Sequence, residues 1–140
     1  MAESNSLRCI VVTPEKAVLD EAADFVVVPM FDGELGVLPG RQPLIGRLGY
    51  GELRTVSGKT TKRYYVDGGF VQVRSDVVTL LTAKAIPAED LNAAAAEAAL
   101  KESTKAALTP FQQEMQQKAQ TRARAQLRII HKLAEEADAL

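Results

Sequence analysis

The stretch Gly33-Glu34-Leu35-Gly36-Val37-Leu38-Pro39-Gly40-Arg41-Gln42-Pro43-Leu44 places three glycines and two prolines around a short apolar run. Glycine adopts backbone dihedrals that other residues avoid, and proline fixes φ at about −65° and removes an amide donor. The stretch contains no nucleophilic side chain. It therefore predicts a rigid, shaped surface loop that is better suited to docking than to catalysis.

On both sides of this stretch, β-branched and aromatic residues form short runs that turn residues divide. The predicted strands are Leu7–Thr13, Ala23–Met30, Glu34–Leu38, Gly51–Val56, Thr60–Val66, Phe70–Arg74 and Val77–Ala83. Strands spaced about ten residues apart, with no helical pattern between them, predict an antiparallel sandwich or barrel. Tight hairpins are expected at Ser57-Gly58-Lys59 and Arg74-Ser75-Asp76, and strand ends at Gly49–Gly51 and Asp67–Gly69. Gly68-Gly69 is predicted to allow a close backbone approach.

After Ile86-Pro87 the composition becomes alanine-rich, which predicts two helices. Glu89 and Asp90 are expected in the first turn of helix one, where negative charge favours the helix dipole. Helix two is expected to start with Thr109 as N-cap, Pro110 and a capping-box Gln112, and to end near Glu136. The turn between them is placed near Ser103–Leu108. The sequence thus predicts an N-terminal antiparallel β-sandwich over residues 1–86 and a C-terminal αα-hairpin over residues 87–140.

Helix two divides its residues between an apolar and a basic side when they are plotted at 100° each. The apolar arc is expected to hold Met115, Ala119, Ala123, Ile130, Leu133 and Ala134, with Phe111, Leu127 and Ile129 at its margins. The basic side holds Lys118, Arg122, Arg124, Arg128 and Lys132. Two interpretations stay open: a solvated face over a packed hairpin, or a stripe that binds an acidic partner. One Phe and no Tyr or Trp on this helix argue against nucleic-acid binding.

Gross composition predicts an intracellular protein from a reducing compartment, with no membrane span. The chain has 140 residues, a formal net charge of −1 and a single cysteine, Cys9, so an internal disulfide is impossible. Residues 1–6 lack the basic and apolar regions of a signal peptide. We find no apolar run near the roughly 20 residues that a membrane span requires. The expectation is a soluble, intracellular protein.

Candidate catalytic residues are few. The only histidine, His131, is expected on the surface of helix two, and Cys9 is expected to be a buried, inert thiol. No cluster of His, Cys, Asp and Glu has zinc-ligand spacing. Ser57-Gly58-Lys59-Thr60 resembles the end of a phosphate-binding loop, but Leu53 replaces the required first glycine and a strand follows. The sequence predicts no catalytic centre, no cofactor and no metal site.

Several motifs together resemble the epsilon subunit of F-type ATP synthases. They are, in order, Ile10–Lys16, Gly33–Leu44, Val66–Val73, Val78–Ala83, Ala88–Leu91 and Arg124–Ile129. The resemblance extends over nearly the whole chain, and the glycine-rich motif is its most specific part.

The resemblance implies a non-catalytic rotor subunit. In that family a ten-stranded β-sandwich at the foot of the central stalk binds the gamma subunit and the c-ring. Glu34, Leu35, Gly36, Pro39 and Arg41 would contact the c-ring and gamma. The helical hairpin would fold against the sandwich or extend into the catalytic alpha/beta head and inhibit ATP hydrolysis, with Arg122, Arg124 and Arg128 facing the head. Membrane association would occur only through the complex, at the cytoplasmic face of a bacterial inner membrane or at a plastid thylakoid.

The chain departs from the family pattern at three places. Gly40-Arg41-Gln42-Pro43 stands where members usually have Gly-His-Ala-Pro. Leu91-Asn92-Ala93-Ala94-Ala95-Ala96 lacks the Asp and Arg of the ATP-binding motif found in some members, which predicts weak or absent ATP binding. Lys101–Gln113 differs from the usual inter-helix turn. The alternatives are a nucleotide-sensing binding module and an unrelated adaptor with a helical hairpin.

Overall fold

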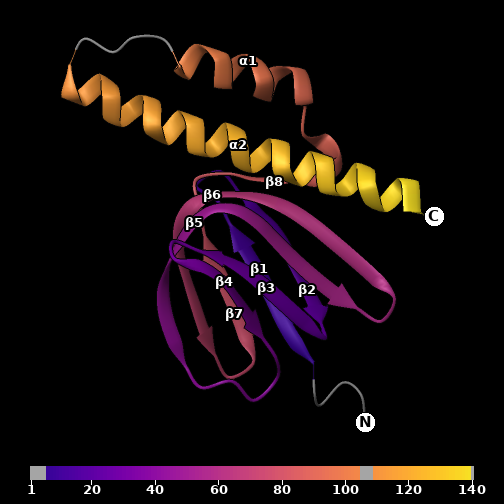
Figure 1. Cartoon of the computed structure of the whole chain (residues 1–140). Helices are drawn as coiled ribbons and strands as arrows, with labels where there is room; N and C mark the ends of the chain where they lie inside the picture. The colour runs from indigo at the N-terminus through magenta and orange to yellow at the C-terminus, as the bar shows by residue number, and fades with distance from the viewer. Residues whose placement is uncertain (1–5, 105–108, 140) are drawn as a thin grey trace. The chain divides into compact units, whose positions relative to one another are not determined.

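The computed structural model describes residues 6–104 and 109–139. The contacts divide the chain into two compact units, Met1–Pro87 and Ala88–Leu140. The first unit holds the strands and the second holds the helices (Figure 1).

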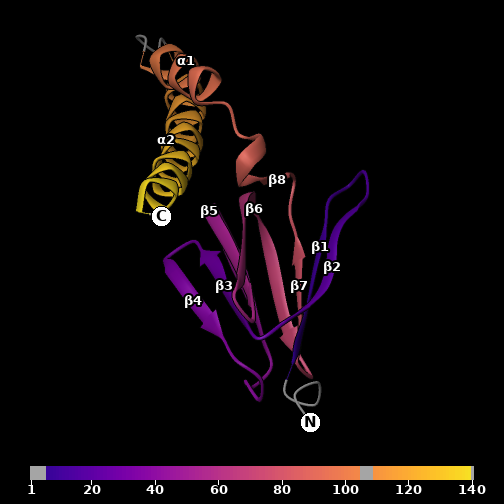
Figure 2. The same cartoon turned by 90° about the vertical axis from the view of Figure 1, so that its right-hand side faces the viewer.

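Eight strands in the described residues build the first unit. They are β1 Leu7–Val12, β2 Ala17–Ala23, β3 Phe25–Met30, β4 Gly33–Val37, β5 Leu44–Ser57, β6 Thr60–Arg74, β7 Val77–Leu81 and β8 Ala85–Pro87. Their order is β2-β1-β7-β6-β5-β3-β4, and β8 pairs with β6. Figure 2 shows β3 and β4 on one side of the sandwich, β1 and β2 on the other, and β5 and β6 between them. The expected β-sandwich is confirmed.

The sandwich arises because two long strands belong to both of its halves. β5 has 14 residues and β6 has 15, and they pair from Leu44↔Val73 to Ser57↔Thr60. The strand ends predicted at Gly49–Gly51 and Asp67–Gly69 were therefore wrong, because the ladder continues through these glycines. The described residues therefore form eight strands instead of the ten that the resemblance implied.

The glycine at position 69 has a steric role. Its φ is +109°, and a Cβ built on it would lie 1.9 Å from the carbonyl oxygen of Leu81 on β7. Gly69 therefore allows the close backbone approach that the sequence predicted. No other amino acid fits there without moving β7.

Both predicted hairpins are confirmed. Ser57 pairs with Thr60 and Arg74 pairs with Val77, so each turn has two central residues. In the second turn Ser75 and Asp76 both have positive φ, 51° and 62°. This is the conformation of a type I′ turn, which matches the twist of the flanking strands.

The sequence did not predict strands β2 and β8. It also did not predict that one pair of strands, β1 and β7, is parallel. β2 is an edge strand with a polar surface, and β8 has three residues that end at Pro87. β1 and β7 pair in parallel, whereas the other pairs are antiparallel. Ion pairs hold the β2 edge: Arg8 binds Asp20 through two hydrogen bonds of 2.7 Å, and Lys62 binds Glu21 at 2.7 Å.

The core of the first unit consists of aliphatic side chains from both sides of the sandwich. Its buried members are Leu7, Cys9, Val11, Leu19, Ala23, Val26, Val28, Val37, Leu48, Leu53, Val66, Val71, Val73, Val78 and Leu80. Cys9 is 0% exposed, and this burial, with a smaller effect of Glu21, raises the pKa of its thiol to about 12. The expected buried thiol is confirmed.

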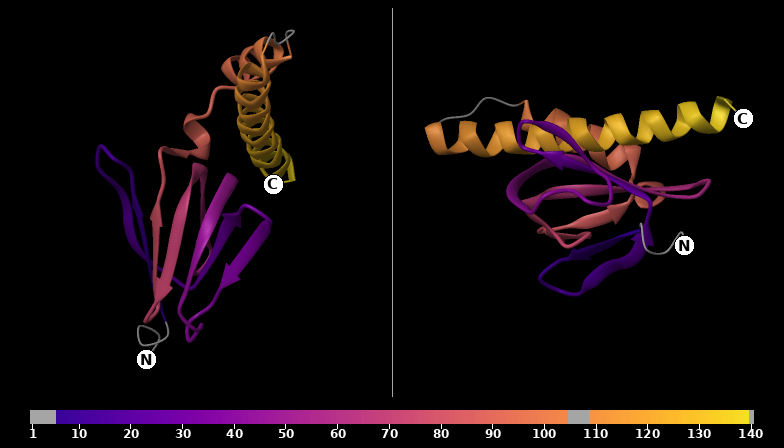
Figure 3. Two further views of the ribbon diagram at one scale, coloured as in Figure 1. Left: turned by 90° about the vertical axis from the view of Figure 1, so that its left-hand side faces the viewer. Right: turned by 90° about the horizontal axis from the view of Figure 1, so that it is seen from below.

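The second unit contains a short 3₁₀-helix, η2 Ala88–Asp90, followed by α1 Ala93–Ser103 and α2 Pro110–Ala139. Glu89 and Asp90 lie in η2, so their expected place in helix one was wrong. Asn92 starts α1 instead, because its side-chain oxygen accepts a hydrogen bond from the Ala95 amide at 3.1 Å. α1 and α2 are antiparallel (Figure 1), and α2 is one continuous helix in both views of Figure 3.

The start of α2 confirms the predicted capping box. The Gln112 amide donates to Thr109 Oγ1 at 3.1 Å, and the Thr109 amide donates to Gln112 Oε1 at 3.2 Å. The expected turn over Ser103–Leu108 lies largely outside the described residues, since 105–108 are not among them.

The apolar arc predicted for α2 was partly wrong. Ala123, Ala125 and Ile129 are buried, but Met115 is 48% exposed and Phe111 70% exposed. The reason is the short α1. Its last residue, Ser103, accepts a hydrogen bond from Gln120 Nε2 at 3.0 Å, so the first turns of α2 extend beyond its end.

Candidate interaction site

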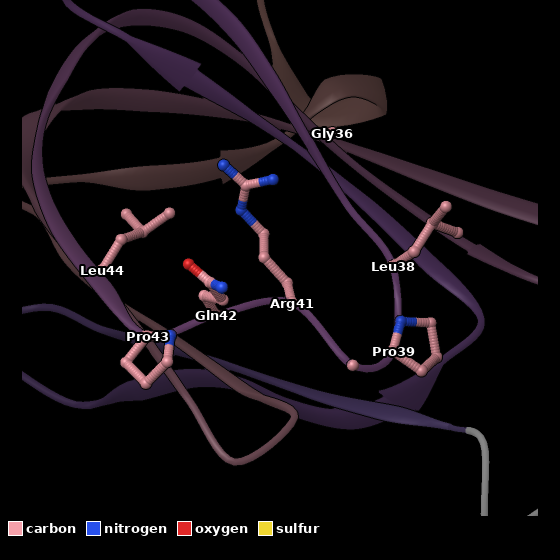
Figure 4. Close-up of a pocket in the computed structure, with 8 residues that line it drawn as sticks. Gly36, Leu38, Pro39, Arg41, Gln42, Pro43 and Leu44 are labelled. Atoms are coloured by element: carbon pink, nitrogen blue, oxygen red, sulfur yellow. The ribbon is translucent and has the colours of Figure 1, made fainter.

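The glycine- and proline-rich stretch forms an edge strand followed by a loop. Gly33–Val37 is β4, which pairs only with β3 in the described sheet, and residues 38–43 lead into β5. The loop surrounds a hollow of about 530 Å³ (Figure 4). Its lining residues are Gly36, Leu38, Pro39, Gly40, Arg41, Gln42, Pro43 and Leu44.

The five sequence-predicted residues of this stretch have different positions. Gly36, Pro39 and Arg41 line the hollow, and the Arg41 side chain extends away from the loop backbone with Leu38 and Leu44 on either side in Figure 4. Glu34 is exposed on β4, whereas Leu35 is half-buried and packs against the core. The stretch therefore presents a polar edge and a hollow with one exposed cation.

One hydrogen bond joins this loop to a distant turn. The Gly40 amide donates to Asp76 Oδ1 at 2.8 Å, across 36 positions of sequence. Gly40 has a φ of +87°, so the loop backbone turns sharply where the bond is made.

A second exposed surface, which we call the apolar face, lies across the outer side of β5, β6 and β7 and includes Phe31 from the β3–β4 turn. It consists of Phe31, Ile45, Phe70 and Leu81, which are 55–77% exposed, together with Arg47. Phe70 pairs with Arg47 on one side and with Leu81 on the other, so these three side chains form one cross-strand row. The Arg47 guanidinium lies 5.5 Å from the centre of the Phe31 ring. Exposed apolar clusters of this kind are typical of protein interfaces.

The sequence reasoning did not find the apolar face, although strand alternation carried a signal. Val71 and Val73 point into the core, which places Phe70 and Gln72 on the outer side of β6. Once the register is known, Phe70 on β6 lies beside Leu81 on β7, and both side chains point outward. Neighbouring exposed apolar side chains of this kind indicate a docking surface.

The three arginines of the helical unit are all on α2, but they differ in exposure. Arg124 and Arg128 are exposed and one helical turn apart, whereas Arg122 is half-buried beside the buried Ala123. Lys118 lies 3.9 Å from Glu114. Exposed cationic character is therefore strongest at Arg124 and Arg128.

Within residues 6–104 and 109–139, no group of three or more His, Cys, Asp or Glu residues is arranged to hold a metal ion. His131 is exposed on α2. Ser57-Gly58-Lys59-Thr60 is the β5–β6 hairpin and does not precede a helix. None of the helices in this described part is long and apolar enough to span a membrane.

A β-sandwich with a glycine- and proline-rich edge loop and an exposed apolar face has the features of a docking domain. Residues 6–88 match the family model of the ATP synthase delta/epsilon chain β-sandwich domain. The ATP synthase epsilon chain of Rhodopirellula baltica is 56% identical over 126 residues, which cover 88% of this chain and 97% of that protein. This chain therefore belongs to the ATP synthase delta/epsilon family, and it is a non-catalytic subunit.

Solved structures share the fold at low sequence identity. A chain of the Euglena gracilis mitochondrial ATP synthase (OSCP/F1/c-ring) matches with a TM-score of 0.71 and 22% identity, covering 95% of this chain and 82% of that one. A chain of the Tetrahymena thermophila mitochondrial ATP synthase central stalk/c-ring matches with a TM-score of 0.71 and 13% identity, covering 89% and 96%. The sequence similarity to the Rhodopirellula baltica protein extends past residue 88. That match covers 126 residues, whereas the family model matches only residues 6–88.

Proposed function

We propose that this chain is the central-stalk rotor subunit of a proton-translocating F-type ATP synthase and couples the c-ring to the gamma subunit. The observation that carries the proposal is the bacterial epsilon-chain relative, whose identity of 56% extends over 97% of its length. The rigid loop supports it, because a stiff connection loses less elastic energy when torque passes between ring and stalk.

In this proposal Glu34, Leu35, Gly36, Pro39 and Arg41 serve the contact with the c-ring and gamma. Glu34 and Arg41 are exposed and can pair with polar groups of a partner. Gly36 and Pro39 shape the hollow, and Leu35 fixes β4 to the core. The test is co-purification with the gamma subunit and c-ring of the same organism. Failure of the full-length chain to bind gamma would disprove the proposal.

The apolar face is the surface that we assign to gamma. It is broad and carries a single charged side chain, Arg47, which suits an apolar partner surface. A Phe70→Lys variant should lose gamma binding because a charge replaces an apolar contact. Phe111→Lys is the matched control, since Phe111 is 70% exposed on α2 and lies outside this face. Equal gamma binding by the two variants would refute the assignment.

The helical hairpin is proposed to inhibit ATP hydrolysis by reaching the catalytic alpha/beta head, where Arg122, Arg124 and Arg128 would meet acidic groups. Exposure of Arg124 and Arg128 supports this role, and half-buried Arg122 contributes less to an exposed cationic surface. Ending the chain after Pro87 should raise the ATPase activity of the assembled enzyme. An Arg124→Ala/Arg128→Ala variant should do the same, whereas Lys118→Ala should not. Unchanged activity in the truncated enzyme would contradict the inhibitory role.

ATP is not proposed as a ligand of this chain. Asn92 already uses its side-chain oxygen to cap α1, and Ala95, at the position of the motif's Arg, provides no cation. Calorimetry with ATP and Mg²⁺ should show no binding at micromolar concentrations.

We also propose that the subunit lies at the cytoplasmic face of a bacterial inner membrane, or at a plastid thylakoid, attached to the membrane only through the complex.

A further inference from the structure

The β6–β7 turn is hydrogen-bonded to the loop of residues 38–43. Asp76 lies in this turn with a φ of 62°, and its Oδ1 atom accepts the Gly40 amide at 2.8 Å. An acceptor carboxylate gives a stronger hydrogen bond than a neutral group does. The turn and the loop are thus joined although 36 positions separate them in sequence.

This hydrogen bond is the only one that residues 38–43 make within the described residues. The backbone bonds outside strands and helices include none from these six residues, and no other side-chain bond reaches them. β4 and β5 fix the two ends of the loop, and between them the Asp76 carboxylate accepts the one hydrogen bond that joins it to another part of the described sandwich.

We propose that Asp76 is a positioning residue, which holds the loop in its binding shape before the partner arrives. The proposal rests on the proposed function, because it assumes that the loop docks in the ATP synthase. A loop that is ordered in advance loses less conformational entropy on binding, so the tether increases affinity without touching the partner. Its loss should weaken docking while the sandwich stays folded.

Because Asp76 has a positive φ, its carboxylate can be removed by a substitution that keeps the conformation of the turn. Glycine adopts this conformation without strain, so Asp76→Gly removes the carboxylate but keeps the turn. Asparagine also tolerates positive φ and retains an acceptor oxygen, so Asp76→Asn preserves most of the tether. Ser75→Gly is the matched control, because Ser75 has a φ of 51° in the same turn, while the hydrogen bond to the loop is made by Asp76.

Two measurements on the full-length chain separate tethering from folding. Amide hydrogen exchange at Gly40 should become at least about tenfold faster in Asp76→Gly and stay near wild type in Ser75→Gly, because only the first substitution removes the acceptor. Affinity for a c-ring–gamma assembly should fall about three- to tenfold in Asp76→Gly and change less than about twofold in Asp76→Asn. Tyrosine fluorescence during denaturation should confirm a folded sandwich in all three variants.

The outcomes distinguish the two proposals. If wild-type protein does not bind the assembly, the proposed function fails, and the exchange rates still show whether Asp76 orders the loop. Wild-type affinity in Asp76→Gly overturns the positioning role, and so does unchanged exchange at Gly40. If Asp76→Gly unfolds, loss of affinity in a folded Asp76→Ala variant supports the role, and wild-type affinity in that variant overturns it.

Discussion

The close approach of β6 and β7 at Gly69 gives Gly69→Ala the shortest Cβ contact of any glycine in the chain. The added Cβ would lie 1.9 Å from the Leu81 carbonyl oxygen and 2.9 Å from the Thr82 Cα atom, and both neighbours are backbone. The φ of +109° adds strain for any residue with a side chain. Because a backbone neighbour cannot rotate away, the paired strands themselves must move.

Two terms set the size of the effect. A residue forced into a sparsely populated backbone region costs about 1–3 kcal/mol. Overpacking a filled site costs about 1–3 kcal/mol more. The free energy of unfolding should therefore fall by on the order of 4 kcal/mol, a large fraction of the roughly 5–15 kcal/mol typical of a domain. For a unit of this size the melting temperature should fall by more than about 15 °C.

Gly58→Ala provides the control. Gly58 also has a positive φ, +60°, but an added Cβ would meet no atom within 4 Å. This variant should lose only about 1–2 kcal/mol, the cost of the left-handed conformation. Denaturant titration followed by tyrosine fluorescence isolates the first unit, since all three tyrosines, Tyr50, Tyr64 and Tyr65, lie in it. Equal unfolding midpoints for the two variants would refute the steric reasoning.

Three further predictions concern the helix cap, an ion pair and the thiol. Thr109→Ala should remove half of the capping box and cost about 1 kcal/mol of helix stability, measured by thermal circular dichroism; an unchanged transition would argue against the cap. The hydrogen bond from Arg8 lowers the pKa of Asp20, so this pair stabilises the fold above the unfolded-state pKa and loses that effect as the pH falls through the folded-state pKa. Asp20→Asn should therefore flatten the acid limb of a plot of melting temperature against pH, and a parallel curve would contradict this. Cys9 should not react with a thiol reagent at pH 8 until the protein unfolds, because burial raises the pKa of its thiol to about 12; rapid labelling of native protein would show otherwise.

Local chemistry explains which parts of the fold could be predicted from the sequence. The β6–β7 turn and the cap of α2 depend on neighbouring residues such as Ser75, Asp76, Thr109 and Gln112, and both appeared where expected. β2 escaped prediction because its Asp20 and Glu21 interact with Arg8 and Lys62, which come from other strands. Such long-range pairs leave no local pattern.

In the candidate site, too, features set by neighbouring residues could be predicted, and features set by long-range contacts could not. Glycines and prolines marked residues 38–43 as a shaped loop, because their backbone restrictions are intrinsic. The bond from Gly40 to Asp76 and the row formed by Arg47, Phe70 and Leu81 depend on strand register, which is a property of the whole sheet. The exposure of Met115 likewise follows from where α1 ends rather than from the sequence of α2.

The parallel pairing of β1 with β7 has a consequence for how the chain is made. Val11 pairs with Leu80, so the first strand meets its central neighbour only after some 69 further residues have been synthesised. Contacts this distant in sequence are slow to form. Until β7 leaves the ribosome, β2 is the only strand of the described sheet with which β1 can form its ladder of hydrogen bonds, and its other edge stays unpaired. The strand order is therefore completed late in synthesis, when β7 takes its place between β1 and β6.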